Sequence, residues 1–379
     1  MKLALLGDDP ELAALAIYAV ETEGQQLVLA HAATAEVSQR FPRAVREGWE
    51  ELLTGRVADV VLVGGSGEQE RIAEQLRLLV QSGVAVVTAH PPSASMLLCY
   101  ELAMIQEDSH SLLLPYFPSR WHPAVERLMA VAEDRDLLGN VEQVVADRQT
   151  SERSRAQVER QFARDVELAR ALVGGLERIA ALAPAGDEPY ANLGVQLSGG
   201  RETIVRWSVG PVSQSSGTHW TVTGTRGSAR LWLPDTLIDV RLEVTSAADS
   251  SDQYFATFDA ARTGWAQIER ALAGEPYAPS WNDACRDVEL AETIERSLIK
   301  GRTVDLHFED YSEQSTFKGT MTSLGCGLLL LGLMVVVVAS VAEGLGLPLF
   351  RFWPHVLLGV LAVFLALQGL RLVFLPQRE

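Results

Sequence analysis

Short apolar runs alternate with amphipathic stretches through the first 118 residues. Five of these runs have the length and composition of buried strands: Lys2–Leu6, Gln26–Ala30, Ala58–Val63, Val84–Thr88 and Ser111–Leu114. The stretches between them have helical spacing of apolar positions. Strands that are apolar throughout and alternate with helices form a parallel sheet that is covered on both faces. The pattern therefore predicts an α/β domain with a doubly wound parallel sheet over residues 1–118.

The pattern changes in the second half of the chain. Val141–Arg148 alternates between apolar and polar positions, and a helical pattern follows over about Ala156–Ala181. Four strand candidates separated by Gly and Ser turns come next: Tyr190–Leu197, Glu202–Ser208, His219–Gly224 and Ser228–Trp232. A last helix is predicted from about Trp281 to Lys300, with Gly301 as its C-cap. Successive strands with short turns indicate an α+β domain over residues 119–310 with a mainly antiparallel open sheet.

The last sixty residues contain two long apolar runs. Leu324–Val341 is almost wholly apolar, and a second run extends from Phe352 to Leu370. A bilayer core needs about 20 apolar residues per helix, so each run is long enough to cross it. A buried hairpin in a soluble core is the alternative, but soluble cores rarely contain two such runs in succession. We predict a transmembrane helical hairpin over 319–376, with spans at about 322–342 and 353–373.

Charges beside these runs predict the orientation of the hairpin. Lys318 precedes the first span, and Arg371 and Arg378 follow the second span, on the side that also holds the large N-terminal part. The positive-inside rule therefore places the soluble domains in the cytoplasm, anchored to the inner or plasma membrane. The N-terminus does not have the pattern of a signal peptide, because its first apolar run ends at Gly7 and acidic residues follow.

Composition narrows the possible partners. The formal net charge is −17, and the residues before Gly319 carry −18, because the tail carries three arginines and two glutamates, a net of +1. Such an acidic surface repels nucleic acid, so we expect no nucleic-acid partner. The three cysteines, Cys99, Cys285 and Cys326, have neither metal-binding nor disulfide-framework spacing, which fits a reducing compartment. The histidines have no partners at metal-ligand spacing, so no metal site is expected.

Four short phrases occur in an order and spacing that resemble a known family. They are Gly83-Val-Ala-Val-Val-Thr-Ala-His-Pro91, Tyr116-Phe-Pro-Ser-Arg-Trp-His-Pro123, Thr221-Val-Thr-Gly-Thr-Arg-Gly227, and Pro279-Ser-Trp-Asn-Asp-Ala-Cys285 with its following helix. Over about residues 1–308 the chain resembles the Gfo/Idh/MocA oxidoreductases, the relatives of glucose–fructose oxidoreductase and inositol dehydrogenase. The resemblance implies a Rossmann-like dinucleotide-binding-fold domain, an NAD or NADP cofactor, and a second-domain sheet that pairs subunits.

The phosphate-binding turn departs from the family pattern. Where the family has G-x-G-x-x-G, this chain reads Gly7-Asp-Asp9-Pro-Glu-Leu12, so the first glycine alone remains. The second glycine normally lets the pyrophosphate approach the helix N-terminus, and Asp9 instead offers its own carboxylate to those N–H groups. Each like-charge contact with a bound dianion at 4 Å would cost about 4 kcal/mol at an effective dielectric of about 20. We therefore expect weak dinucleotide binding.

The positions that carry catalysis in the family are also substituted. By alignment with the family's E-K-P segment, His90 stands where the family has its lysine. Arg164 stands at the catalytic histidine, and Glu167 at the aspartate three residues later. An arginine cannot accept a proton near neutral pH, so Arg164 cannot be a general base. His90 and Glu167 either form a re-tuned acid–base pair or have no catalytic role.

A glycine-rich loop follows the third predicted strand. Gly64, Gly65 and Ser66 could hold an anion at the carboxyl end of that strand, or could form a tight turn before a helix. Together with Gly7 and Asp9, they are the candidate cofactor-binding residues.

Two hypotheses follow from these residues. The first is a membrane-anchored oxidoreductase homologue that has lost hydride transfer and acts as a binding, scaffolding or regulatory module. The alternative is an active NAD(P)-dependent oxidoreductase that uses His90 and Glu167 on a sugar, polyol or amino-sugar derivative. The partners expected are the membrane, a second copy through the second-domain sheet, and another membrane protein. The substituted motifs favour the first hypothesis.

Overall fold

The computed structural model describes residues 1–306, apart from Arg56, 65–68, Ala94, 185, 187, 200–202 and 247–249, and also Met334. Residues Met1–Leu306 form one compact unit. Within the described part of the chain, no helix has the length and apolar character needed to cross a membrane. The two predicted spans, at about 322–342 and 353–373, lie outside the described residues except for Met334.

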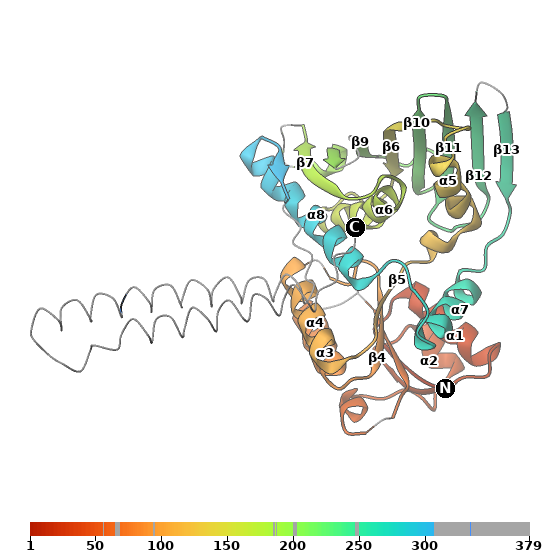
Figure 1. The fold of residues 1–379 in the computed structure, drawn as a ribbon. Helices are drawn as coiled ribbons and strands as arrows, with labels where there is room; N and C mark the ends of the chain where they lie inside the picture. Colours follow the sequence, from red (N-terminus) through yellow and green to blue (C-terminus); the bar gives the residue numbers. More distant parts are fainter. Residues whose placement is uncertain are drawn as a thin grey trace, which may run out of the picture. The chain divides into compact units, whose positions relative to one another are not determined.

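The first sheet has five parallel strands in the order β2-β1-β3-β4-β5 (Figure 1). The strands are β1 (Lys2–Leu6), β2 (Gln26–His31), β3 (Val60–Val63), β4 (Ala85–Ala89) and β5 (Leu113–Tyr116). The connecting helices are α1 (Pro10–Glu21), α2 (Ala35–Arg40), α3 (Gln69–Gln81) and α4 (Met96–Ser109), with a short 3₁₀ turn at Glu50–Leu53. The predicted Rossmann-like parallel sheet is confirmed. Its fully apolar strands need cover on both faces, and the helices supply that cover.

Two helices from late in the sequence return to this sheet. The structure places α7 (Ala260–Leu272) beside α1, where Trp265 and Ile268 join the same apolar core as Leu12. The start of α8 (Trp281–Lys300) packs on the opposite face of the sheet with α3 and α4 (Figure 1). Trp281 also donates its Nε1–H to the carbonyl of Cys99 at 2.9 Å. The first sheet is therefore completed by residues from the far end of the described chain.

The second sheet has nine strands in the order β13-β12-β11-β10-β6-β9-β8-β7-β14. These strands are β6 (Val141–Gln149), β7 (Leu176–Leu182), β8 (Gly194–Gly199), β9 (Ile204–Gly210), β10 (Gly217–Gly224), β11 (Gly227–Pro234), β12 (Val240–Ser246), β13 (Ser250–Phe255) and β14 (Val304–Asp305). All neighbours pair antiparallel except β6 and β9. The predicted open, mainly antiparallel sheet is confirmed.

Helices α5 (Pro123–Glu133) and α6 (Arg155–Val173) pack on this second sheet, α5 against β11 and β12 and α6 against β6 and β9. Short 3₁₀ turns at Pro118–Trp121 and Pro189–Asn192 precede α5 and β8. Helix α6 also contacts α8, so it lies between the second sheet and the helices of the first.

The predicted helix over 156–181 is wrong after Val173. Helix α6 ends at Val173, and 176–182 form β7, which pairs with β8 and β14. Gly174 adopts φ = 88° and ends the helix, since only glycine takes that conformation without strain. The segment Leu176–Leu182 has good helix formers, but pairing on two edges overrides that preference. Strands β12, β13 and β14 and helices α5 and α7 were not predicted.

Candidate functional site

Five of the predicted site residues, Gly7 among them, lie at or face the carboxyl edge of the first sheet. Ligands of doubly wound folds bind at this edge, near the point where the strand order reverses. Asp9 follows β1, Gly64 follows β3, and His90 follows β4, while α6 brings Arg164 towards the same edge. Gly65 and Ser66 lie outside the described residues, so their predicted role stays a prediction.

The turn after β1, which the family resemblance predicts to face a phosphate, is capped by the chain's own carboxylate. Asp9 is the N-cap of α1, and its Oδ1 accepts the backbone N–H groups of Glu11 at 3.0 Å and Leu12 at 3.1 Å. The Asp9 residue is 4% exposed. These N–H groups are the donors that an anion at a helix N-terminus would use. The predicted capping by Asp9 is therefore seen directly, and it leaves two fewer donors for a phosphate.

The glycines of this edge serve close packing between two turns. Gly7 has φ = 94°, and the Gly64 N–H donates to the carbonyl of Leu6 at 2.7 Å. A Cβ on Gly64 would lie 3.0 Å from the Asp9 Cβ and 3.1 Å from its backbone nitrogen. The turn after β3 thus lies so close to the turn after β1 that a side chain at Gly64 would require the Asp9 backbone or Cβ to move by a few tenths of an ångström.

Two ion pairs connect this turn to α6. Arg160 lies 3.2 Å from the second carboxylate oxygen of Asp9. Arg164 contacts both carboxylate oxygens of Glu11, at 2.7 and 3.2 Å, and its guanidinium lies 5.1 Å from the centre of the Phe117 ring. The arginines are four residues apart and share one helix face. Arg164, which was predicted to stand at the family's catalytic histidine, is held by Glu11 against the turn after β1.

A cleft of about 330 Å³ lies between this turn, α6 and the end of β11. Its lining includes Asp9, Glu11, Phe117 and Arg164, together with Leu233 and Asp235 from the second sheet. Neither His90 nor Glu167 is among the described residues that line it. The cleft lies at the carboxyl edge of the first sheet, and two of the three predicted catalytic residues, His90 and Glu167, do not line it.

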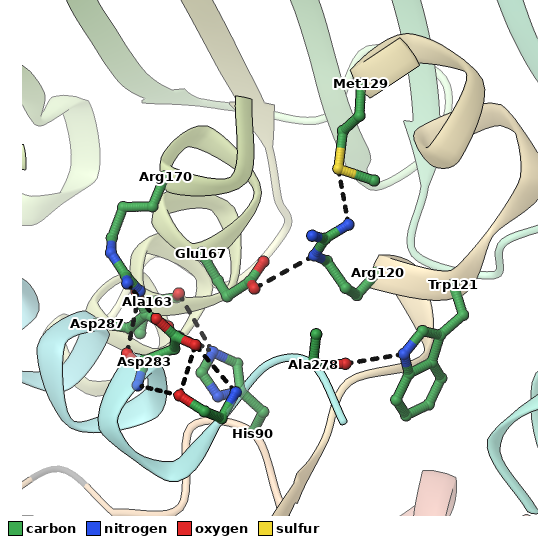
Figure 2. A network of polar contacts seen from close by, with 11 residues as sticks. His90, Arg120, Trp121, Met129, Ala163, Glu167, Arg170, Ala278, Asp283 and Asp287 are labelled. Carbon is green, nitrogen blue, oxygen red and sulfur yellow. Dashed lines mark hydrogen bonds and ion pairs between the residues drawn. The ribbon is translucent and has the colours of Figure 1, made fainter. Parts of the chain in front are cut away.

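His90 is enclosed in a separate polar network (Figure 2). It is 0% exposed, its Nε2 lies 3.4 Å from both the carbonyl of Ala163 and Oδ2 of Asp287, and its ring packs 5.0 Å from Phe117. Burial, with the charge of Arg164 nearby, lowers the pKa of His90 to about 3. Burial also raises the pKa of Asp287 well above its usual range. Both groups are therefore held towards their neutral forms, since removal from water penalises charge.

Arg170 belongs to the same network, and Glu167 is close enough for its charge to act on Asp287. Arg170 donates to Asp287 Oδ1 at 2.8 Å and to Asp283 Oδ1 at 2.5 Å. Glu167 Oε1 lies 3.4 Å from Arg120 Nε, and burial raises the pKa of Glu167 to about 7 against the opposing influence of Arg120 and Arg170. Figure 2 shows Glu167 and Asp287 on neighbouring helices, α6 and α8.

This network could hold a proton, but it offers a substrate no contact. His90 Nδ1, Glu167 Oε2 and Asp287 Oδ2 have no hydrogen-bond partner among the described residues, and each atom is buried. General acid–base catalysis needs the proton-transferring atom within hydrogen-bond reach of the reacting group. An imidazole with a pKa of about 3 is also a weak base at neutral pH. The structure brings His90 and Glu167 into one cluster and Arg164 into another.

Several residues of these clusters were not predicted from the sequence. Three of them, Arg160, Arg170 and Asp287, belong to amphipathic helices with ordinary charge patterns. Their partners are far away in the sequence: Arg160 pairs with Asp9 over 151 residues, Arg170 with Asp287 over 117, and Asp287 with His90 over 197. One signal could have suggested two of these pairs: Arg160 and Arg164 are four residues apart on one helix face, and Asp9 and Glu11 are two acidic residues close together at the start of α1.

A second helix N-terminus at this edge is also capped from within the chain. Glu292 of α8 accepts the backbone N–H of Met96, the first residue of α4, at 2.7 Å. Carboxylates therefore occupy the N-termini of both α1 and α4. No group of residues in the described part of the chain has the composition and geometry of a metal site.

The fold is similar to that of solved oxidoreductases. A myo-inositol dehydrogenase from Corynebacterium glutamicum has a TM-score of 0.64 and 18% identity, over 82% of this chain and 99% of that one. An oxidoreductase from Agrobacterium radiobacter, in complex with NAD⁺, L-tartaric acid and magnesium, has a TM-score of 0.67 and 15% identity, over 80% and 98%. Levoglucosan dehydrogenase, in complex with NADH and L-sorbose, has a TM-score of 0.68 and 13% identity, over 82% and 99%.

These structures are Gfo/Idh/MocA-type oxidoreductases, so the resemblance predicted from the four phrases is confirmed for the fold. No protein-family model matches the chain, and no curated protein does. At such low identity the likeness establishes the fold, and activity has to be argued from the site itself.

Proposed function

We propose that this chain is a membrane-tethered binding or regulatory module on an oxidoreductase fold, and that it does not transfer hydride. One observation carries the proposal. The carboxylate of Asp9 takes the N–H groups at the start of α1 and pairs with Arg160. In this fold a dinucleotide would need those N–H groups for its pyrophosphate. The chain fills its phosphate-binding turn with its own negative charge.

The buried network supports the same conclusion. An active enzyme using His90 and Glu167 would need these groups to reach a substrate in the cleft, whereas His90 is 0% and Glu167 4% exposed. NAD or NADP is the cofactor that the related structures lead one to expect, and we propose that this chain binds neither at physiological concentration. The same proposal includes where the chain is located and what it binds. Residues 319–376 tether it to the membrane with its other domains in the cytoplasm, and its partners are a second copy, through the second sheet, and a membrane protein.

Calorimetric titration of the full-length protein in detergent with NAD⁺, NADH, NADP⁺ and NADPH tests the proposal. We expect no binding up to about 1 mM, which corresponds to less than about 4 kcal/mol of binding free energy. A dissociation constant below about 100 μM, or turnover of any of the four cofactors, would overturn it.

The Asp9→Gly variant tests the physical reason. It restores the second glycine of the motif, removes one negative charge and frees Arg160. Glycine is tolerated at an N-cap at a cost of only a few tenths of a kcal/mol, so the helix should persist. We expect dinucleotide affinity to increase at least tenfold. Thr34→Gly, which alters the N-cap of α2 away from the cleft, is the matched control and should show no gain. If Asp9→Gly also fails to bind, Asp9 is not the obstruction.

A further inference from the structure

Most charged side chains that line the cleft satisfy one another. Glu11 and Arg164 are joined by two hydrogen bonds, and Asp8 also has an interaction partner. Asp165 accepts two hydrogen bonds from Arg148, at 3.0 and 2.7 Å. A molecule in the cleft is therefore recognised by the polar groups that these contacts leave open.

Two charged side chains of the cleft are open on one side. Among the described residues, Arg160 has one polar partner: its Nη2 donates to Asp9 Oδ2 at 3.2 Å, and its side chain is 33% exposed. A guanidinium has five N–H donors in a planar fork, so the others can bind a carboxylate. Within the same part of the chain, the Asp235 carboxylate accepts from Arg148 through Oδ1 alone, and its side chain is 46% exposed. The cleft thus offers one open cation and one open carboxylate oxygen.

A buried amide oxygen is a second, independent sign of a ligand. Gln161 lines the cleft and is 6% exposed. Its Nε2 donates to Thr150 Oγ1 at 3.0 Å, but its Oε1 has no partner among the described residues. Native structures normally satisfy a buried oxygen of this kind, because leaving it without a donor is costly. A molecule in the cleft can supply the missing donor.

The open acceptors and the open donor come from different sides of the cleft. Gln161 and Asp165 are four residues apart and share one face of α6, and Arg148 connects Asp165 to Asp235. The two acceptors, Gln161 Oε1 and the Asp235 carboxylate, therefore belong to the side near the end of β11. Arg160 pairs instead with the turn after β1. This arrangement suits a ligand with a positive and a negative group close together.

Apolar side chains form much of the remaining lining. They are Phe117 after β5, Leu168 of α6, and Leu233, Pro234 and Leu237 at the end of β11 and just after it. We call these five residues the apolar wall. A volume of about 330 Å³ is at the small end of ligand pockets, so one small molecule with an apolar part fits it.

We infer that the cleft binds a free α-amino acid with an apolar side chain. Its carboxylate pairs with Arg160, its ammonium group donates to Gln161 Oε1 and to Asp235, and its side chain packs on the apolar wall. An amino acid has no net charge at neutral pH, so its binding needs no excess of either sign in the cleft. A sugar or polyol could donate to Gln161, but it would bring no opposite charge to Arg160 or Asp235. This assignment names the ligand of the proposed binding module and rests on that proposal, because a dinucleotide would occupy the same edge of the sheet.

Four compounds separate the two charges from the side chain. L-Leucine has all three features, L-leucinol lacks the carboxylate, 4-methylpentanoate lacks the ammonium group, and glycine lacks the side chain. Calorimetric titration of the full-length protein in detergent at pH 7 and low salt should give binding of leucine that is tighter by about fivefold or more than that of leucinol or 4-methylpentanoate. Glycine should bind about tenfold more weakly than leucine or worse, because it buries no apolar surface.

Three variants assign the contacts. Arg160→Gln should weaken leucine and 4-methylpentanoate but not leucinol, because it removes the partner of the carboxylate. Asp235→Asn and Gln161→Met should weaken leucine and leucinol but not 4-methylpentanoate, because each removes a partner of the ammonium group. Arg155→Gln and Asp252→Asn are the controls: both residues are exposed, form ion pairs and lie outside the lining, so they should change no affinity. An unchanged thermal midpoint shows that a variant is folded.

Every other result with the parent protein overturns the inference. Binding of leucinol as tight as that of leucine would mean that the carboxylate has no partner, and the same result for 4-methylpentanoate would exclude a partner for the ammonium group. Equally tight binding of glycine would exclude the apolar wall. No binding of leucine at about 10 mM would mean that water alone satisfies Gln161. In all these cases the proposed function stands if the dinucleotides also fail to bind, whereas binding of a dinucleotide would remove both.

Discussion

Replacement of Glu167 by glutamine should stabilise the protein at alkaline pH. Glu167 is 4% exposed on α6, and burial raises its pKa from 4.5 to about 7. Between pH 4.5 and 7, therefore, Glu167 carries a proton in the folded protein but not in the unfolded chain. The contribution of this group to stability is fully present below pH 4.5, and it is lost as the pH rises to 7. A glutamine is neutral at every pH and removes this loss.

The size of the effect follows from the shift in pKa. A raise from 4.5 to about 7 costs about 3 kcal/mol once Glu167 is ionised, at 1.36 kcal/mol for each pKa unit. The raised pKa already includes the opposing attraction of Arg120, so no separate ion-pair energy is subtracted. At pH 8 the stabilisation should be about 3 kcal/mol, or about 5 °C in thermal midpoint for the compact unit Met1–Leu306, at about 2.1 cal/mol/K of unfolding entropy per residue. Near pH 4.5 it should vanish.

Thermal unfolding of full-length protein in detergent, followed by tryptophan fluorescence at pH 5 and pH 8, measures this difference. Glu295→Gln is the matched control, because Glu295 is an exposed residue of α8 that pairs with Arg155, which lowers its pKa. Loss of that pair should slightly lower the midpoint at pH 8. If Glu167→Gln shifts the midpoint equally at both pH values, or lowers it at pH 8, Glu167 does not hold a proton in the folded protein and the account of the network fails.

Two further substitutions test the buried polar groups. His90→Gln should gain about 2 kcal/mol of stability relative to the parent as the pH falls from 7 to 5. The reason is that the pKa of about 3 keeps the folded imidazole neutral, whereas the imidazole of the unfolded chain is protonated below pH 6.5. Thermal midpoints at the two pH values measure this gain, and an equal shift at both values would contradict it. Asp165→Asn should destabilise the protein by about 3 kcal/mol or more, because it leaves the buried Arg148 without its bidentate carboxylate. Urea unfolding at pH 7 measures that loss, and a change below about 1 kcal/mol would show that Asp235 holds Arg148 alone.

The strands of the first sheet were predictable because each is a short run with no polar position. Such a run can be stable only when both faces are covered, so composition alone indicates a parallel sheet between helix layers. The four phrases in order then indicated the whole fold. Leu176–Leu182 was not predictable as a strand, because its side chains suit a helix and the pairing with β8 and β14 decides otherwise.

Asp9 was predicted as an N-cap from its place before Pro10, because a cap needs only neighbours in the sequence. The sequence by itself thus determined the two sheets and the N-cap of α1. Tertiary structure alone decided the partners of the charged residues: α6 brings Arg160 and Arg164 against residues about 150 positions earlier, and α8 encloses His90 with Asp287. Charges far apart in the chain carry no mutual pattern until packing brings them within a few ångströms, where burial and Coulomb interaction fix their roles.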